Sequence, residues 1–82
     1  MSAKDLQLNI ISAEKTIFSG RVPIVTLPGT LGSFNVLPDH APLVSSLKAG
    51  VITYTDNGSL VTTEVKGGFV EVKQDVVTVC IE

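Results

Sequence analysis

The clearest pattern in the chain is an alternation of apolar and polar residues near its beginning. Within residues 5–11, Leu6, Leu8 and Ile10 share one parity, and the residues between them are polar. Side chains of a β-strand point alternately to its two faces. The alternation therefore predicts a first strand with one buried and one solvated face.

The next segments are less regular. Residues 21–27 carry apolar side chains on both parities and predict a central strand, with Pro23 near its start or on an edge where a missing N–H does no harm. Gly20 is expected to supply a bend just before this strand. Between residues 27 and 42, turn residues interrupt apolar ones, and a long loop or short twisted strands both fit.

The second half of the chain alternates strand patterns with turn signals. Strands are expected over residues 43–47, 51–55, 59–66, 69–73 and 76–81. Asn57-Gly58 suits the two positive φ angles of a type I′ hairpin turn, and Gln74-Asp75 indicates a further turn. Gly67-Gly68 fits a hairpin or a sharp bulge, and the pattern does not choose.

Composition supports the same fold class. The chain has 12 Val, 6 Ile and 8 Thr, residues whose branched side chains favour strands over helices. Its 82 residues suffice for one hydrophobic core. We predict an all-β fold, a flattened sandwich or barrel of eight to ten short strands, as a single domain over residues 1–82.

Charge and composition exclude several classes of function. A formal net charge of −2, with three Phe, one Tyr and no Trp, argues against nucleic acid as a partner. The single cysteine and the lack of a signal-peptide pattern predict an intracellular protein. The apolar runs are far shorter than the roughly 20 residues needed to cross a bilayer.

Catalytic and metal-binding patterns are missing from the sequence. His40 is the only histidine and Cys80 the only cysteine, so one chain cannot assemble a zinc site from such residues. We expect Cys80 to be a small buried hydrophobe, and carboxylates such as Asp75 to be solvated charges. Residues 29–32 are rich in glycine but lack the Lys of a phosphate-binding loop. The sequence predicts no cofactor and a protein that is not an enzyme.

Lys48 is the one residue that suggests a modified carrier. Its place before a bend resembles the modified lysine of lipoyl-type carrier domains, which are also small β-sandwiches. The acidic or methionine neighbour expected before that lysine is missing. A carrier domain modified on Lys48 therefore stays an alternative, as does a free-standing interaction module.

Four segments carry a resemblance to a known family. The sequence GSFNVLPDHAPL over residues 32–43 resembles the signature of the ATP synthase epsilon family. Further matches follow in the same order, at residues 11–14 with 18–20, at residues 48–51 and at residues 67–72. The resemblance covers essentially the whole chain, and corresponds to the first domain of longer members, which continue into a two-helix hairpin.

The resemblance implies a non-catalytic connector in the central stalk of the motor. It implies partners, the gamma subunit and the polar loops of the membrane c-ring, and a place on the cytoplasmic face of the bacterial inner membrane. The residues that match the loop facing the c-ring are Thr30, Leu31, Gly32, Ser33 and Phe34. Those that match positions lying toward gamma are Ser12, His40 and Ser45.

Two local features of this signature remain open. Residues 38–42 also fit a rigid turn with no partner, in which the prolines fix φ and His40 bonds locally. Asn35 stands where the family often has Gly, and we expect it to adopt the positive φ that Gly would supply.

Overall fold

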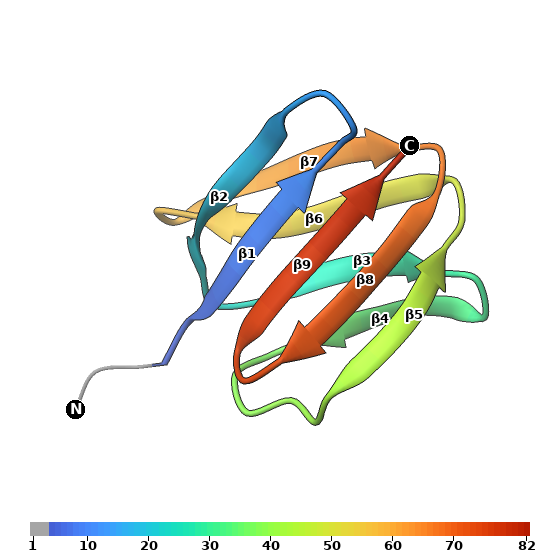
Figure 1. Ribbon diagram of the computed structural model, residues 1–82. Helices are drawn as coiled ribbons and strands as arrows, with labels where there is room; N and C mark the ends of the chain where they lie inside the picture. The colour runs from blue at the N-terminus through green and yellow to red at the C-terminus, as the bar shows by residue number, and fades with distance from the viewer. Residues whose placement is uncertain (1–3) are drawn as a thin grey trace.

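The computed structural model describes residues 4–82, which form nine β-strands (Figure 1). The strands are β1 (Leu6–Ile11), β2 (Thr16–Val22), β3 (Val25–Gly29), β4 (Gly32–Val36), β5 (Leu43–Leu47), β6 (Gly50–Asp56), β7 (Ser59–Val65), β8 (Gly68–Lys73) and β9 (Val76–Ile81). The prediction of an all-β sandwich is confirmed. The predicted domain, residues 1–82, begins outside the described residues.

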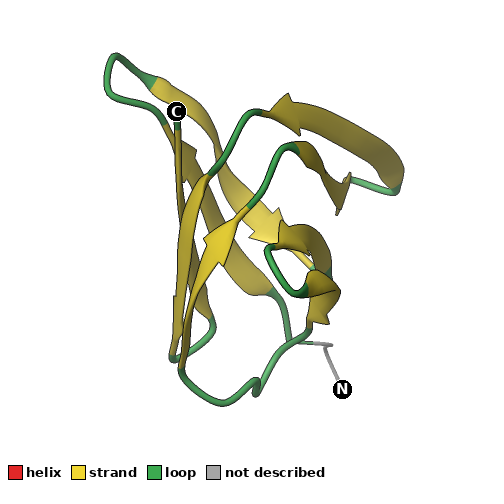
Figure 2. Cartoon of the chain, turned by 90° about the vertical axis from the view of Figure 1, so that its right-hand side faces the viewer, coloured by secondary structure: helices red, strands yellow, loops and turns green. Residues whose placement is uncertain are grey.

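The strands form two layers that share hydrogen bonds at one corner. The front layer runs β2-β1-β9-β8-β5, and the back layer runs β4-β3-β6-β7. Within the front layer β1 and β9 pair in parallel, and the other pairs are antiparallel. Strand β3 joins the layers because Gly29 at its end pairs with Leu47 of β5. Figure 2 shows the layers edge-on, with the front layer on its left.

The core lies between the layers and follows the alternation of the strands. The completely buried side chains include Leu6, Leu8 and Ile10 of β1, as the sequence pattern predicts. The other large side chains with no exposure are Val22, Val25, Leu27, Val36, Ile52, Val70, Val77 and Val79. Where β2 meets β6, the rings of Phe18 and Tyr54 lie 4.5 Å apart between centroids and close the sandwich.

The prediction for residues 21–27 is wrong in its boundaries. Strand β2 ends at Val22, the chain bends at Pro23, and β3 begins at Val25, because the chain crosses here from the front layer to the back layer. Gly20 is not a bend. It lies inside β2, where the ring of Phe18 covers it so closely that a Cβ would come 2.9 Å from Cζ.

The turn predictions have mixed outcomes. Asn57 and Gly58 have φ of 50° and 81° and connect β6 to β7, as a type I′ turn requires. Gly67-Gly68 is neither a hairpin nor a bulge, because β7 and β8 lie in different layers. At Gly68, with φ of 147°, a Cβ would overlap the carbonyl oxygen of Cys80. Backbone crowding therefore requires glycine at this crossing.

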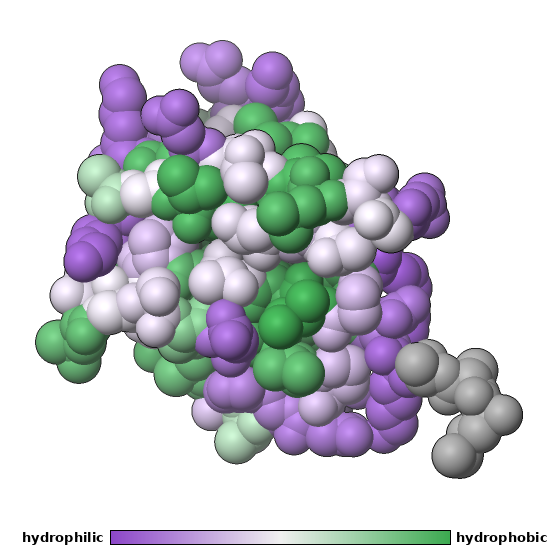
Figure 3. Space-filling view, turned by 180° about the vertical axis from the view of Figure 1, so that it is seen from behind, coloured by the Kyte–Doolittle hydropathy of each residue, from purple (hydrophilic) through white to green (hydrophobic). Residues whose placement is uncertain are grey.

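The outer face of the back layer mixes hydroxyl and amide groups with apolar side chains, among them the exposed Val51 and Leu60. On the back layer, Asn35, Thr26, Thr53 and Thr62 lie in one register row across four strands. Figure 3 shows this back face, where green and pale groups cover most of the middle and purple groups lie mainly at the edges. No helix long and apolar enough to cross a membrane occurs among residues 4–82.

Cys80 is not the fully buried residue that the sequence suggested. Its thiol is free and half-buried on the outer face of the front layer. The reason is parity, because Val77 and Val79 point into the core and Cys80 points to the opposite face of β9.

Candidate functional site

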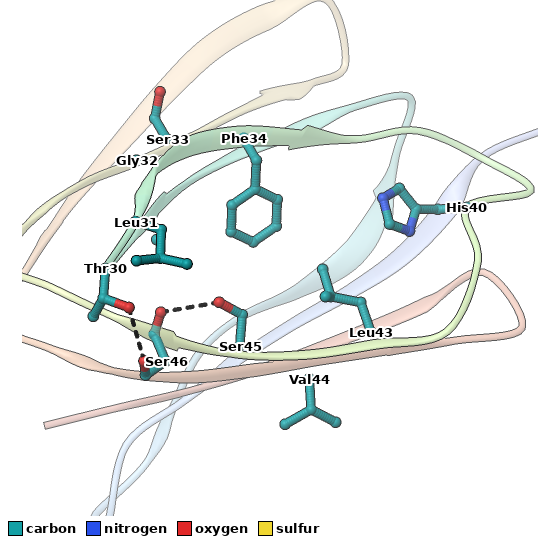
Figure 4. A pocket seen from close by; sticks show the side chains of 11 residues that line it. Thr30, Leu31, Gly32, Ser33, Phe34, His40, Leu43, Val44, Ser45 and Ser46 are labelled. Carbon is teal, nitrogen blue, oxygen red and sulfur yellow. Dashed lines mark hydrogen bonds between the residues drawn. The ribbon is translucent and has the colours of Figure 1, made fainter.

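An open groove lies where the β3–β4 hairpin faces β5 (Figure 4). Its volume is about 620 Å³. It is lined by Gly29, Thr30, Leu31, Gly32, Ser33, Phe34, His40, Leu43, Val44, Ser45 and Ser46. The groove is therefore built from a hairpin tip on one side and from the β4–β5 loop with β5 on the other.

The hairpin tip has a rigid base and an exposed end. The ring of Phe34 lies under Gly29, where a Cβ would approach Cε1 to 2.9 Å, so the close packing requires glycine. Gly32 has φ of 135°, which a side chain rarely permits. Leu31 at the end of the tip is fully exposed, at 104%. An apolar side chain is thus held out in solvent on a well-packed support.

Hydrogen bonds tie this tip to β5. The backbone N–H of Thr30 donates to the carbonyl oxygen of Ser46 over 3.2 Å. The hydroxyl groups of the same two residues lie 3.0 Å apart. These main-chain and hydroxyl contacts fix the tip relative to β5 and close one end of the groove.

The opposite wall combines apolar and hydroxyl groups. Leu43 packs against the core, whereas Val44 is exposed and points away from the hollow (Figure 4). The hydroxyl of Ser45 donates to the carbonyl oxygen of Ser46 over 3.1 Å. His40 is half-buried, and its Nδ1 lies 2.6 Å from the carbonyl oxygen of Ala41.

The structure brings most of the predicted site residues together. The tip residues matched to the c-ring loop line the groove, and so do His40 and Ser45, matched to positions facing gamma. Ser12 lies apart, in the β1–β2 connection at the top of Figure 1. There its hydroxyl accepts from the N–H groups of Glu14 and Lys15, which makes it a turn-forming residue.

Asn35 departs from its prediction. It lies within β4 and is not among the residues with positive φ. Its side-chain oxygen accepts a hydrogen bond of 2.8 Å from the hydroxyl of Thr26 on the paired strand. Asn35 therefore stabilises strand pairing, and Gly32 supplies the positive φ of the hairpin.

Sequence reasoning missed part of the groove, namely Gly29, Leu43, Val44 and Ser46. The period-2 pattern of residues 43–47 predicts their strand, but nothing local indicates that this strand faces the hairpin tip. The contact depends on the pairing of Gly29 with Leu47, which joins distant parts of the chain.

The chemistry of the groove suits recognition of a protein surface. Among its lining residues only His40 has an ionisable side chain. Within residues 4–82, no three residues of the types His, Cys, Asp and Glu gather as metal ligands would. The lining offers exposed apolar side chains beside hydroxyl and main-chain groups, which is the mixture found at protein interfaces.

The fold is thus a two-layered β-sandwich with an open groove at one edge. The chain belongs to the family described as the ATP synthase delta/epsilon chain β-sandwich domain, whose family model matches residues 5–82. The resemblance predicted from residues 32–43 is thereby confirmed.

Curated relatives agree with this assignment. The ATP synthase epsilon chain of Leptospira interrogans is 39% identical over 79 residues, which are 96% of this chain and 62% of the relative. The epsilon chain of Geobacter sulfurreducens is 41% identical over 80 residues, 98% of this chain and 58% of the relative. The chain thus spans about six-tenths of the length of these relatives.

Solved structures show the same fold. A chain of the Euglena gracilis mitochondrial ATP synthase, in a structure of OSCP, F1 and c-ring, superposes with a TM-score of 0.89 at 22% identity. The match covers 96% of this chain and 51% of that one. A chain from the central stalk and c-ring of the Tetrahymena thermophila enzyme gives 0.78 at 10% identity, covering 99% and 66%.

These matches do not favour the alternative functions. Lys48 is exposed between β5 and β6, and its backbone N–H donates to the carbonyl oxygen of Pro28 over 2.9 Å. This hydrogen bond, next to the point where β3 pairs with β5, accounts for the position of Lys48 without a carrier role.

Proposed function

We propose that this chain acts as the β-sandwich domain of an epsilon subunit, a non-catalytic part of the central stalk of a rotary ATP synthase. It links the gamma subunit to the c-ring and couples proton or sodium transport to ATP synthesis. The observation that carries this proposal is the family match over residues 5–82. Within the complex the chain lies at the cytoplasmic face of the bacterial inner membrane.

The groove supports a division of roles between its two walls. The tip formed by Thr30, Leu31, Gly32, Ser33 and Phe34 contacts the polar loops of the c-ring. His40 and Ser45 on the opposite wall contact gamma, and Ser12 meets gamma from the β1–β2 connection. Exposed Leu31 offers apolar contact area, and Phe34 holds the tip from below.

The c-ring contact is tested by enlarging Ser33, which is exposed and points away from the hollow (Figure 4). In membranes that contain the assembled enzyme, Ser33→Trp is expected to impair ATP-driven ion pumping. The melting temperature of the isolated chain should not change, because Ser33 contributes nothing to the core. Ser59→Trp, at an exposed serine beside the β6–β7 turn, is the matched control and should pump normally.

Two outcomes would contradict this role. Normal pumping by Ser33→Trp and by a deletion of Thr30 and Leu31 would show that the tip is only a turn. Equal loss of pumping in the Ser59→Trp control would show that the defect is not specific to the tip.

The gamma contact is tested by calorimetric titration of gamma with the wild-type chain and with His40→Ala. One histidine at the edge of an interface contributes modestly, so the variant is expected to lose about 1 kcal/mol or less of binding free energy. Failure of His40→Ala to fold would make His40 a structural residue and remove it from the interface. Titration with ATP should give no binding in the submillimolar range, as expected of a non-catalytic subunit.

A further inference from the structure

Three charged residues join separate segments at the lower end of the sandwich, where the β4–β5 loop meets the β8–β9 turn (Figure 1). The ammonium group of Lys4 lies 2.8 Å from Oδ1 of Asp39. The backbone N–H of Asp39 donates to Oδ1 of Asp75 over 2.7 Å. The segment before β1, the loop and the turn are therefore connected through polar contacts.

Asp39 is the third residue of a tight turn, where the backbone is left-handed. The N–H of His40 donates to the carbonyl oxygen of Leu37 over 3.2 Å, and Asp39 has φ of 67°. With Pro38 before it, this is a type II turn, whose third residue is preferably Gly or Asn. The left-handed conformation is less favourable for Asp than for Gly, so a contact from outside the turn would stabilise it.

Asp75 provides that support. The N–H of the third residue in a type II turn makes no bond within the turn, and here it donates to a carboxylate, which makes a strong hydrogen bond. Lys4 pairs with Asp39, the residue whose backbone N–H donates to Asp75. Its hydrogen bond to Asp39 and the charge of Asp39 raise the pKa of the Lys4 ammonium above its usual value. Desolvation opposes this rise, and the charge of Asp75 makes the smallest contribution.

The supported turn ends at His40, whose side chain lines the groove. We propose that Asp75 is a positioning residue that, together with the Lys4–Asp39 ion pair, holds the turn of residues 37–40 and so presents His40 to the gamma subunit. The gamma part of this inference rests on the proposed function. The positioning part does not, because it concerns the isolated chain.

The β8–β9 turn allows a clean pair of variants. Gln74 and Asp75 have φ of 50° and 63°, so both residues of this two-residue turn are left-handed. Gly and Asn both suit that conformation. Asp75→Gly keeps the hairpin and removes the acceptor, whereas Asp75→Asn keeps the hairpin and a side-chain oxygen that can still accept from Asp39.

The first test is hydrogen exchange by NMR on the 82-residue chain without any partner. In Asp75→Gly, the amide proton of Asp39 should exchange at least about tenfold faster, because its charged acceptor is gone. Asp75→Asn should restore most of the protection. Amides of β6, far from this turn, should not change in either variant. Unchanged exchange at Asp39 in Asp75→Gly would overturn the positioning role.

The second test measures binding of gamma to the same three proteins. Asp75→Gly is expected to raise the dissociation constant about threefold to tenfold, with recovery in Asp75→Asn. If the Asp39 amide exchanges faster in Asp75→Gly but this variant binds gamma as tightly as the wild type, Asp75 does not act on the interface. The proposed function would not be affected by that result. No binding by the wild-type chain would instead overturn the gamma part of the proposed function.

Discussion

Two turns of the same type connect antiparallel strands on different sides of the molecule. Asn57-Gly58 connects β6 to β7 with φ of 50° and 81°, and Gln74-Asp75 connects β8 to β9 with φ of 50° and 63°. The first pair is the sequence that favours this turn most strongly. The second pair places Gln and Asp in the left-handed region, of which only Asp is common there, and it lacks the Gly that the turn favours at its second position.

The difference follows from what each turn does besides reversing the chain. The Asn57-Gly58 turn is exposed at a hairpin end. The second turn makes tertiary contacts, because Asp75 accepts from the N–H of Gln7 through its carbonyl oxygen and from Asp39 through its carboxylate. The residues that favour this turn are therefore present where the turn only closes a hairpin. They are absent where the turn also contacts other segments.

The largest effect is expected at a glycine whose role is not turn geometry. Gly68→Ala should lower the free energy of unfolding by about 3 kcal/mol, because its Cβ would overlap the backbone at Cys80. Gly58→Ala, at a position with open space around it, should cost only about 1 kcal/mol for the φ of 81°. Urea denaturation measures both, and equal losses would show that crowding at Gly68 is relieved by a backbone shift.

Giving the first turn the residues of the second is the next test. The double variant Asn57→Gln, Gly58→Asp should lose about 1–2 kcal/mol of unfolding free energy, because two unsuited residues adopt positive φ without tertiary contacts. Its affinity for gamma should equal that of the wild type. Weaker gamma binding with a native fold would place this hairpin in the interface.

The reverse exchange separates stability from binding. In Gln74→Asn, Asp75→Gly the better turn sequence offsets the lost hydrogen bond to Asp39, so the unfolding free energy should change by no more than about 0.5 kcal/mol. Affinity for gamma should still fall as it does for Asp75→Gly alone. A marked loss of stability would mean that the contact with Asp39 holds the hairpin as well as the loop.

The smallest effect concerns Lys4 and pH. Because the folded state raises the pKa of Lys4 above 10.5, its contribution to stability is fully present below pH 10.5 and is lost as pH rises through the folded-state pKa. The difference in melting temperature between wild type and Lys4→Met should therefore be small at neutral pH and absent in strong alkali. High salt should reduce it at neutral pH, since the pair is exposed. A difference that persists in alkali would point to packing of the side chain.

Sequence patterns predicted the fold where one face of a strand is buried. The parity of Leu6, Leu8 and Ile10 and the Asn57-Gly58 turn both express local rules, and both are confirmed. Strand β2 was missed over residues 16–20 because its inward parity includes Gly20 and its outward parity includes the apolar Ile17, so the sequence shows no clean alternation.

The site could be predicted only in part. The signature around His40 indicated the right segments, but the joining of two segments in one groove depends on the corner where β3 meets β5. Asp75 was expected to be a solvated charge, since nothing local indicates that the β8–β9 turn reaches Asp39. Contacts between residues far apart in the sequence produce no periodic pattern of apolar and polar positions.

The parallel pairing of β1 with β9 has a consequence for how the domain is made. β9 inserts between β1 and β8, so the front layer is incomplete until the last of the nine strands has left the ribosome. Until then the buried face of β1 has only β2 beside it in the sheet. A topology dominated by such distant pairings folds slowly compared with one built from local contacts. The unfinished sheet is therefore exposed to chaperones and to misassociation until β9 has emerged.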